Sequence, residues 1–372
     1  MKRERSTTKR MRKEIVKQVE ESAETPVEDL IDDFSKGLIH SGSVMLNLAC
    51  SDRWNGGYGR GKMTNVVGDS SAGKTALALI HLAHCANNPD FDDYELIFDD
   101  VESALEFDIK KLCGEKAFNR IKAPAYDEEG EPVYSDTIQE WHNRIEKLLD
   151  SGQQFIYVLD SFDALTSREE LLKYDKNKKE EEAGRKTKGS YGDGKPKEMS
   201  KIGRMIKKRL KDSNSHVLVI SQTRDKLDAM MFEEKKIRSG GNALRFYACH
   251  EVWLAVKEKL KEKNRQVGAL VRIRIKKNKM TGKIRQVEVP LFYDYGIDDI
   301  GSCIDFLLEE KVWRERKGEI IPDIKGIPAG KRDNIIKVIE NKGLEKELFK
   351  RTEQAWLEVE DSLKLNRKPK FA

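Results

Sequence analysis

The sequence is poor in cysteine, and its cysteines form no recognisable motif. Five cysteines are spread over 372 residues, and no two of them form a C-x-x-C pair. This spacing argues against a zinc ribbon and against a disulfide framework. No apolar run approaches the ~18 residues that a membrane span needs, and we expect no signal peptide. We therefore expect a protein of a reducing compartment, the cytoplasm, without a membrane partner.

Histidine is also scarce, and the chain has no internal repeat of fixed period. There are six histidines, of which His81 and His84 lie three residues apart in a segment expected to be helical. No third ligand candidate is close to them in sequence, so we interpret them as packing or surface residues rather than metal ligands. The lack of a repeat argues against solenoid and propeller folds.

Charge of one sign does not dominate, but it is unevenly distributed. The net charge of +5 arises from 70 basic and 65 acidic residues, and basic residues recur at 1–20, 197–211, 224–238 and 257–285. This pattern favours a polyanionic partner, although the same side chains could simply solvate exposed helices. The hydrophobic fraction of 38% supports one large core with appendages, or two domains.

One stretch carries specific chemistry, because residues 68–75 form a complete G-x-x-x-x-G-K-T phosphate-binding loop. We expect a strand at 63–67 before it and a helix over 76–86 after it. Backbone N–H groups and the helix N-terminus would surround phosphate oxygens. Lys74 would contact the β- and γ-phosphates and Thr75 would ligate Mg²⁺. The predicted site for ATP comprises Gly68, Asp69, Ser70, Ser71, Ala72, Gly73, Lys74 and Thr75.

Further buried strands are expected at 94–100, 155–160 and 217–221, with a helix at 137–150 and another at 200–211. The second of these strands ends in Asp160, which is typical of an ATPase carboxylate that supports the metal. Strand and helix alternate up to residue 222, which predicts an α/β fold with a mostly parallel sheet and the nucleotide at the carboxyl ends of its strands. Later strands at about 250–257, 269–276 and 284–291 predict an antiparallel extension.

The chain is predicted to have three regions. Residues 1–36 form a polar N-terminal arm, either solvated or docked on a neighbouring subunit. Residues 37–296 form the ATPase core, and 297–372 form a small α-rich C-terminal module anchored by Trp313 and Trp356. Within the core, the stretches 168–200 and 223–241 are polar and rich in glycine, so we expect them to be mobile rather than packed.

The motifs taken together resemble the RecA family of DNA recombinases, in particular its bacterial and phage members. The resemblance runs, with gaps, from about residue 41 to 295, and rests on the motifs at 100–106, 158–166, 220–224, 240–248 and 276–279. A phosphate loop alone occurs in many ATPases, whereas this ordered set is much more specific. The resemblance implies a RecA-like P-loop NTPase core, and the divergent flanks favour a phage origin.

The resemblance also assigns catalytic roles to Lys74 and to four further residues. Glu102 resembles the general base that orients the attacking water, and Gln222 the sensor of the γ-phosphate. Lys277 and Lys279 resemble a pair that reaches into the ATP site of the next protomer. The role of Glu102 has independent support, because a carboxylate at a strand end can orient water. The shared role of Lys277 and Lys279 also has support, because residues two apart on a strand point to the same face. The alternative for Glu102 is an ordinary acidic residue on the surface. The alternative for Lys277 and Lys279 is a strand edge exposed to solvent.

The stretches 168–200 and 223–241 correspond to the DNA-binding loops of the family. Their basic residues would hold phosphates, their glycines would offer N–H groups, and their apolar residues would stack on bases or pack internally. The predicted DNA-binding residues are Lys197, Arg204, Arg224, Lys226, Met231, Phe232, Lys235, Lys236, Arg238, Gly240, Gly241 and Asn242.

The resemblance implies a DNA-dependent ATPase that forms a homo-oligomeric helical filament on single-stranded DNA. Such a protein pairs that strand with homologous double-stranded DNA and exchanges the strands, hydrolysing ATP with Mg²⁺. Two alternatives share the same core: a ring helicase, and a recombination mediator in which ATP acts only as a switch.

Overall fold

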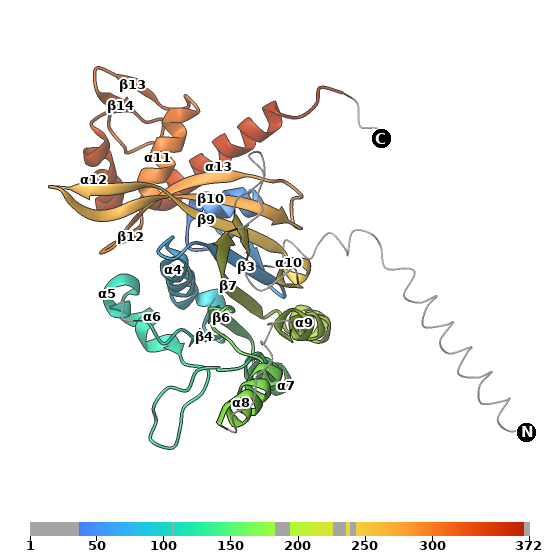
Figure 1. Cartoon of the computed structure of the whole chain (residues 1–372). Helices are drawn as coiled ribbons and strands as arrows, with labels where there is room; N and C mark the ends of the chain where they lie inside the picture. The colour runs from blue at the N-terminus through green and yellow to red at the C-terminus, as the bar shows by residue number, and fades with distance from the viewer. Residues whose placement is uncertain (1–36, 106–107, 183–193, 226–235, 239–242, 368–372) are drawn as a thin grey trace, which may run out of the picture. The chain divides into compact units, whose positions relative to one another are not determined.

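The computed structural model describes residues 37–105, 108–182, 194–225, 236–238 and 243–367. The predicted N-terminal arm, 1–36, lies outside these residues. At the centre is a ten-stranded sheet with the order β12-β11-β10-β9-β3-β7-β6-β4-β5, with β8 paired to β7 (Figure 1). A separate two-stranded sheet joins β1 (Leu38–Ile39) and β2 (Tyr58–Gly59).

The strands from β9 to β5 run parallel to one another, and those from β9 to β12 run antiparallel. This arrangement confirms the predicted parallel sheet with an antiparallel extension. The parallel strands are β3 (Met63–Gly68), β4 (Glu95–Asp100), β5 (Ile121–Lys122), β6 (Phe155–Asp160), β7 (His216–Asp225) and β9 (His250–Glu262). The others are β8 (Lys236–Arg238), β10 (Arg265–Asn278), β11 (Gln286–Phe292) and β12 (Gly296–Ile297).

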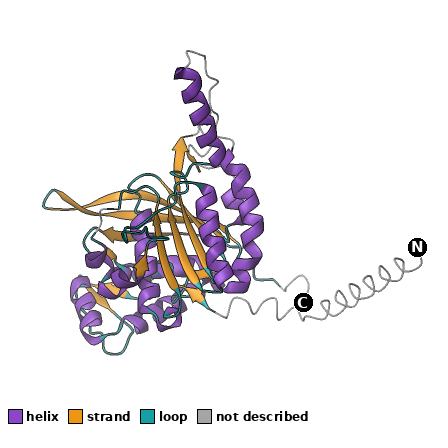
Figure 2. Ribbon diagram, turned by 90° about the horizontal axis from the view of Figure 1, so that it is seen from below, coloured by secondary structure: helices purple, strands orange, loops and turns teal. Residues whose placement is uncertain are grey.

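Helices cover both faces of the sheet (Figure 2). In β6, Tyr157 packs into one hydrophobic cluster and its neighbour Val158 into the other, because successive side chains of a strand point to opposite faces. One cluster contains α3 (Val44–Ser51) and α4 (Lys74–Asn87), and the other α7 (Ile138–Ser151) and α9 (Gly194–Ser213). The shorter helices are η2 (Pro89–Phe91), α5 (Ile109–Cys113), α6 (Glu115–Arg120) and α10 (Ala243–Tyr247).

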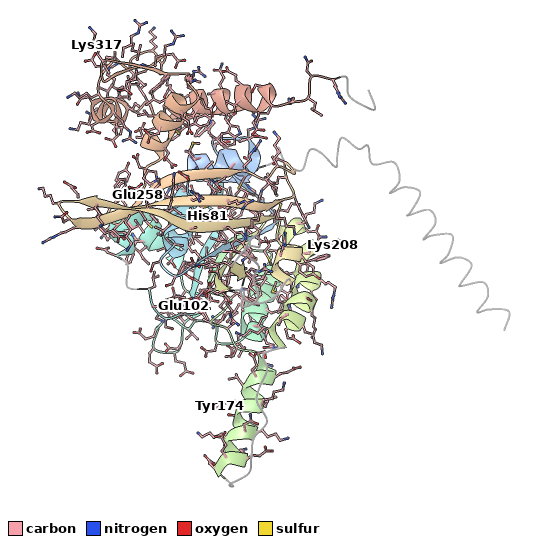
Figure 3. The ribbon with its side chains drawn as sticks, turned by 45° about the horizontal axis from the view of Figure 1, so that its top comes forward. His81, Glu102, Tyr174, Lys208, Glu258 and Lys317 are labelled. Carbon is pink, nitrogen blue, oxygen red and sulfur yellow. The ribbon has the colours of Figure 1, made fainter. Side chains whose placement is uncertain are left out.

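The described parts of the segment 168–200 differ from the expectation of a stretch without regular structure, and residues 183–193 lie outside the described residues. Residues 168–182 form helix α8 (Arg168–Glu182), and α9 begins already at Gly194. Every residue of α8 is at least partly exposed, and Figure 3 shows Tyr174 on this projecting helix. The low apolar content of this segment correctly indicated that it is not packed in the core. Its Glu and Lys residues are nevertheless good helix formers. Pairs such as Lys176–Glu180, at 3.9 Å, further stabilise an exposed helix.

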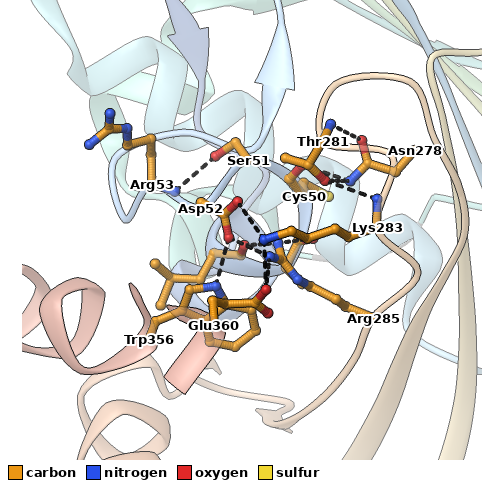
Figure 4. Close-up of polar contacts among 12 residues, drawn as sticks. Cys50, Ser51, Asp52, Arg53, Asn278, Thr281, Lys283, Arg285, Trp356 and Glu360 are labelled. Atoms are coloured by element: carbon orange, nitrogen blue, oxygen red, sulfur yellow. Dashed lines mark hydrogen bonds and ion pairs between the residues drawn. The ribbon is translucent and has the colours of Figure 1, made fainter. Parts of the chain in front are cut away.

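The C-terminal residues share the hydrophobic cluster that covers the antiparallel strands, in which Trp313 and Trp356 are buried. An ion network strengthens this packing (Figure 4). Arg285 lies 2.6 Å from Asp52 and 2.8 Å from Glu360, and the Trp356 indole donates to Asp52 at 2.9 Å. The elements are α11 (Asp299–Glu309), β13 (Arg314–Arg316), β14 (Glu319–Ile321), α12 (Arg332–Lys342) and α13 (Glu345–Ser362).

All five cysteines are free thiols buried in the fold. Among the described residues, every helix is too short or too polar to span a lipid bilayer.

Candidate active site

The phosphate loop follows β3 and leads directly into α4, as its motif requires. Gly73 is the N-cap of α4 with a φ of 87°, a conformation that favours glycine. A Cβ atom at Gly73 would lie 2.5 Å from Leu291 Cδ2, and one at Gly68 would lie 2.7 Å from the Leu254 carbonyl oxygen. Both glycines are therefore required for the loop to approach the sheet. The first N–H groups of α4 point into the loop, where they can bind an anion.

Lys74 and Thr75 lie beside Asp160, which ends β6. Lys74 is 8% exposed, and its ammonium donates to the Asp69 carbonyl at 2.7 Å. Burial lowers the pKa of Lys74, while the Asp160 and Glu102 carboxylates oppose this shift. The Thr75 hydroxyl donates to Asp160 Oδ2 at 2.6 Å. Burial raises the pKa of Asp160 to about 6, against the stabilising hydrogen bond from Thr75. Two adjacent oxygen donors of this kind fit Mg²⁺.

Glu102 lies two residues beyond the end of β4, and neighbouring strands hold its carboxylate in place. Its Oε1 accepts hydrogen bonds from the Ser161 hydroxyl at 2.5 Å and from Gln222 Nε2 at 2.9 Å. The Gln222 backbone N–H donates to Asp163 Oδ2 at 2.6 Å. Sequence reasoning missed Ser161 and Asp163 as neighbours of the site, although both directly follow the strand that ends in Asp160.

The phosphate loop is also joined to the segment that follows β7. The Thr223 hydroxyl and the Lys236 ammonium both donate to the Asp69 carboxylate. Burial acts to raise the pKa of Asp69, but these two hydrogen bonds outweigh it and the pKa is lowered. A residue of the phosphate loop therefore contacts both β7 and β8, whose residues 223–225 and 236–238 belong to the second predicted DNA-binding stretch and form strands there.

Lys277 and Lys279 lie together, but away from the phosphate loop of their own chain. Both ammonium groups donate to the Phe246 carbonyl, at 3.0 and 3.4 Å. Lys277 is in register with Glu251, which in turn pairs with Asn65 near the amino end of β3. The phosphate loop begins at the opposite, carboxyl end of that strand. Burial and the charge of Lys279 lower the pKa of Lys277 to about 8, so an incoming anion would be stabilised there.

Comparison with known proteins decides the family. The sequence model of the RecA N-terminal domain matches residues 13–298. The chain belongs to the RecA family. Protein RecA of Mycobacterium ulcerans is 28% identical over 321 residues, which cover 85% of this chain and 83% of that protein. Protein RecA of Oleidesulfovibrio alaskensis is 29% identical over 273 residues, which cover 73% of this chain and 69% of that protein. Protein RecA of Helicobacter hepaticus is 26% identical over 314 residues, which cover 83% of this chain and 81% of that protein.

In this RecA-family chain, Lys197 and Arg204 lie on the exposed face of α9. Apolar residues at helical spacing fill the opposite face and are buried: Met199, Ile202, Ile206 and Leu210. Further basic residues share the exposed side, namely Lys201, Lys208 and Lys211. The amphipathic pattern therefore turns a row of cations outward, in an arrangement that can contact successive phosphates.

The predicted DNA-binding residues of the second stretch are only partly described. Arg224 is exposed at the end of β7. Lys236 bonds to Asp69, and Arg238 donates to the Asn65 side chain at 2.9 Å, so these two cations contact the protein itself. Seven others lie outside the described residues: Lys226, Met231, Phe232, Lys235, Gly240, Gly241 and Asn242.

Proposed function

We propose that this RecA-family chain is an ATP-dependent DNA recombinase. It assembles as a helical filament on single-stranded DNA and catalyses homologous pairing and strand exchange with double-stranded DNA. One observation carries the proposal: the hydrogen bond from Gln222 to Glu102 joins a hydrolytic carboxylate to the strand that leads into a predicted DNA-binding stretch. A ring helicase and an ATP-switched mediator are the competing functions.

Hydrolysis of ATP to ADP and phosphate uses residues at the ends of three strands, β3, β4 and β6. Lys74 and the loop N–H groups bind the phosphates, and Glu102 orients the water that attacks the γ-phosphate. Thr75 and Asp160 would hold Mg²⁺, which when bound neutralises phosphate charge. The 2.6 Å contact between these two oxygen atoms supports this donor set. Ser161 positions Glu102 through its hydroxyl.

Nucleotide and DNA binding are coupled through Gln222 and Asp69. A γ-phosphate beside Glu102 competes for the Gln222 amide, and a phosphate in the loop competes with the Asp69 carbonyl for Lys74. Gln222 belongs to β7, and Asp69 accepts hydrogen bonds from Thr223 of β7 and Lys236 of β8. Both changes therefore act on residues connected to these two strands. ATP would thereby shift the population of the DNA-binding conformation, and its hydrolysis would release DNA.

Lys277 and Lys279 act on the ATP of an adjacent protomer. Their place near the other end of the sheet argues against contact with their own nucleotide, and the depressed pKa of Lys277 indicates a site that gains from an anion. In a filament the pair would neutralise charge that develops on the neighbour's phosphates, as an arginine finger does.

Electron microscopy with ATP and single-stranded DNA tests the proposal. We expect open helical filaments that require both ligands, and none with Lys74→Ala, which loses the phosphate contact. Closed rings would indicate a helicase, and discrete clusters a mediator. Strand exchange between a labelled single strand and a homologous duplex then checks the activity itself.

A further inference from the structure

A second group of polar side chains lies at the far end of α4 from the phosphate loop. His40 follows β1, His84 stands in the last turn of α4, and Asp299 is the first residue of α11. One potential ligand atom from each of these side chains lies within 4.8 Å of the other two. They come from positions 40, 84 and 299, so the fold alone brings them together.

Neighbouring groups hold each of the three side chains in place. The rings of His40 and His84 stack with centroids 3.6 Å apart and planes 18° from parallel. Asp299 Oδ1 accepts the Val44 backbone N–H at 2.7 Å, which leaves lone pairs on its carboxylate for a second partner. The His40 carbonyl is bonded to His81 Nδ1 at 2.6 Å. The ring stack and the Val44 bond thus position the side chains, and the bond to His81 fixes the backbone of His40.

His84 and Asp299, together with Asn87 and Tyr295, line a cavity of about 350 Å³ that is open to solvent. All three side chains are partly exposed. An ion could therefore enter without local unfolding, and a water molecule could complete its coordination.

The donor set determines which ion fits. Two imidazoles and one carboxylate suit zinc, whereas Mg²⁺ prefers oxygen ligands alone. Ligand atoms around tetrahedral zinc are roughly 3.3 Å apart, given bond lengths of about 2.0–2.1 Å, so zinc binding requires the rings of His40 and His84 to rotate out of their stack and turn one nitrogen each towards the ion. His40 Nδ1 accepts the Gly42 N–H at 3.1 Å, so ligation through His40 exchanges this hydrogen bond for a metal–nitrogen bond.

We propose that His40, His84 and Asp299 form a zinc-binding site that fastens the C-terminal end of α4 to α11. The inference does not depend on the proposed recombinase function, because it rests on residues that the ATP site does not use. Zinc bound there would join the phosphate-loop helix to the C-terminal region and stabilise the folded chain by mass action.

The test is zinc binding to the full-length, metal-free protein, measured by competition with a chromophoric chelator. Excess Mg²⁺ in the buffer occupies the oxygen ligands at Thr75 and Asp160. We expect one zinc per chain and a higher thermal midpoint of unfolding when zinc is added. Co²⁺ in place of zinc should give visible absorption typical of a tetrahedral site with nitrogen ligands.

Two conservative variants remove ligands without removing packing. His84→Phe keeps a ring to stack on His40, and Asp299→Asn keeps an acceptor for the Val44 N–H. Each should weaken zinc binding about tenfold or more and abolish the thermal shift, while His142→Ala, a histidine of α7 beside Glu146, should change neither. Failure of the wild-type chain to bind one zinc, or unchanged zinc affinity in both folded variants, would overturn the proposal.

Discussion

At the scale of single residues, the position of Glu102 is set by its hydrogen-bond donors. Ser161 and Gln222 both donate to the same oxygen, Oε1, which leaves Oε2 to accept a proton from water. Ser161 follows β6 and Gln222 belongs to β7. Two adjacent strands therefore fix a residue that itself lies beyond its own strand, β4. Such preorganisation is what a general base needs.

Replacing Glu102 by Gln should preserve ATP binding and remove most hydrolysis. The amide keeps the size of the side chain and an acceptor for Ser161, but it cannot take a proton. We expect turnover on single-stranded DNA to fall about 10²- to 10⁴-fold, with tighter retention of DNA in the trapped ATP state. Turnover and binding of a fluorescent ATP analogue would be measured together. Glu95→Gln, at the other end of β4, is the control, and near-normal turnover in Glu102→Gln would exclude Glu102 as the base.

At the scale of elements, α9 combines a structural and a chemical face. Its buried apolar residues attach it to the sheet, and its cations are thereby held in one outward row. Lys197 and Arg204 are seven positions apart, two turns of a helix, and so share this face. Contacts of these cations with DNA would reach phosphate rather than bases, so we expect them to contribute affinity but little sequence preference.

The double variant Lys197→Ala, Arg204→Ala should bind single-stranded DNA more weakly and with a shallower salt dependence. Loss of two phosphate contacts should reduce the slope of log affinity against log salt by about 1.4. Titrations at several salt concentrations, on two oligonucleotides of unrelated sequence, would measure this, with Lys147→Ala on the exposed side of α7 as control. A salt slope equal to that of the wild type would place both residues outside the DNA contact.

At the scale of the whole molecule, the sheet separates two groups of charges that one chain cannot bring together. The phosphate loop lies at the carboxyl end of β3. The Lys277–Lys279 pair lies two strands away from β3, at the level of the amino end of β3. We propose that activity that needs both groups comes from an interface between protomers, which would tie hydrolysis to assembly.

The variant Lys277→Ala, Lys279→Ala should still bind nucleotide but lose DNA-stimulated hydrolysis and cooperative filament assembly. Mixing it with Lys74→Ala gives the sharper test, because each protein is inactive for a different reason. An interface between the two can pair an intact phosphate loop with an intact lysine pair, so hydrolysis should partly recover in the mixture. Normal hydrolysis on DNA by the lysine variant alone would refute action between protomers.

Buried histidines should make the folded chain sensitive to acid. His250 is fully buried beside Tyr58, and burial lowers the pKa of its imidazole to about 4 from an ordinary 6.5. The unfolded chain binds the extra proton between these values. The contribution of His250 to the free energy of unfolding is therefore fully present above pH 6.5. It is lost as the pH falls towards 4, and the total loss is about 3 kcal/mol.

We would compare urea unfolding of the wild type and of His250→Phe from pH 7.5 to 4, with EDTA present. The comparison isolates the contribution of His250, because all other titrating groups are common to both proteins. The free energy of unfolding of the variant should fall less steeply with acid, by up to about 3 kcal/mol over the interval. Parallel pH profiles for the two proteins would show that His250 titrates normally in the folded state.

Local sequence was sufficient for the main strands of the sheet, for the phosphate loop and for a helix at 200–211. The loop could be predicted because its chemistry lies within residues 68–75, and a strand such as 155–160 because its apolar run is nearly continuous. Family motifs then extended the prediction to Glu102 and Gln222, which lie near strand ends at one edge of a parallel sheet.

The tertiary structure alone decided which of these residues touch. Glu102 bonds to Gln222 and Asp69 bonds to Lys236, across 120 and 167 positions of the chain. Ligand atoms of His84 and Asp299, 215 positions apart, lie within 4.8 Å of each other. Such contacts depend on the strand order, in which β7 and β6 stand between β3 and β4. That order follows from the packing of the whole core, and no local pattern encodes it. Hence His84, interpreted from its neighbours in sequence as a packing or surface residue, lies in space beside two further ligand candidates.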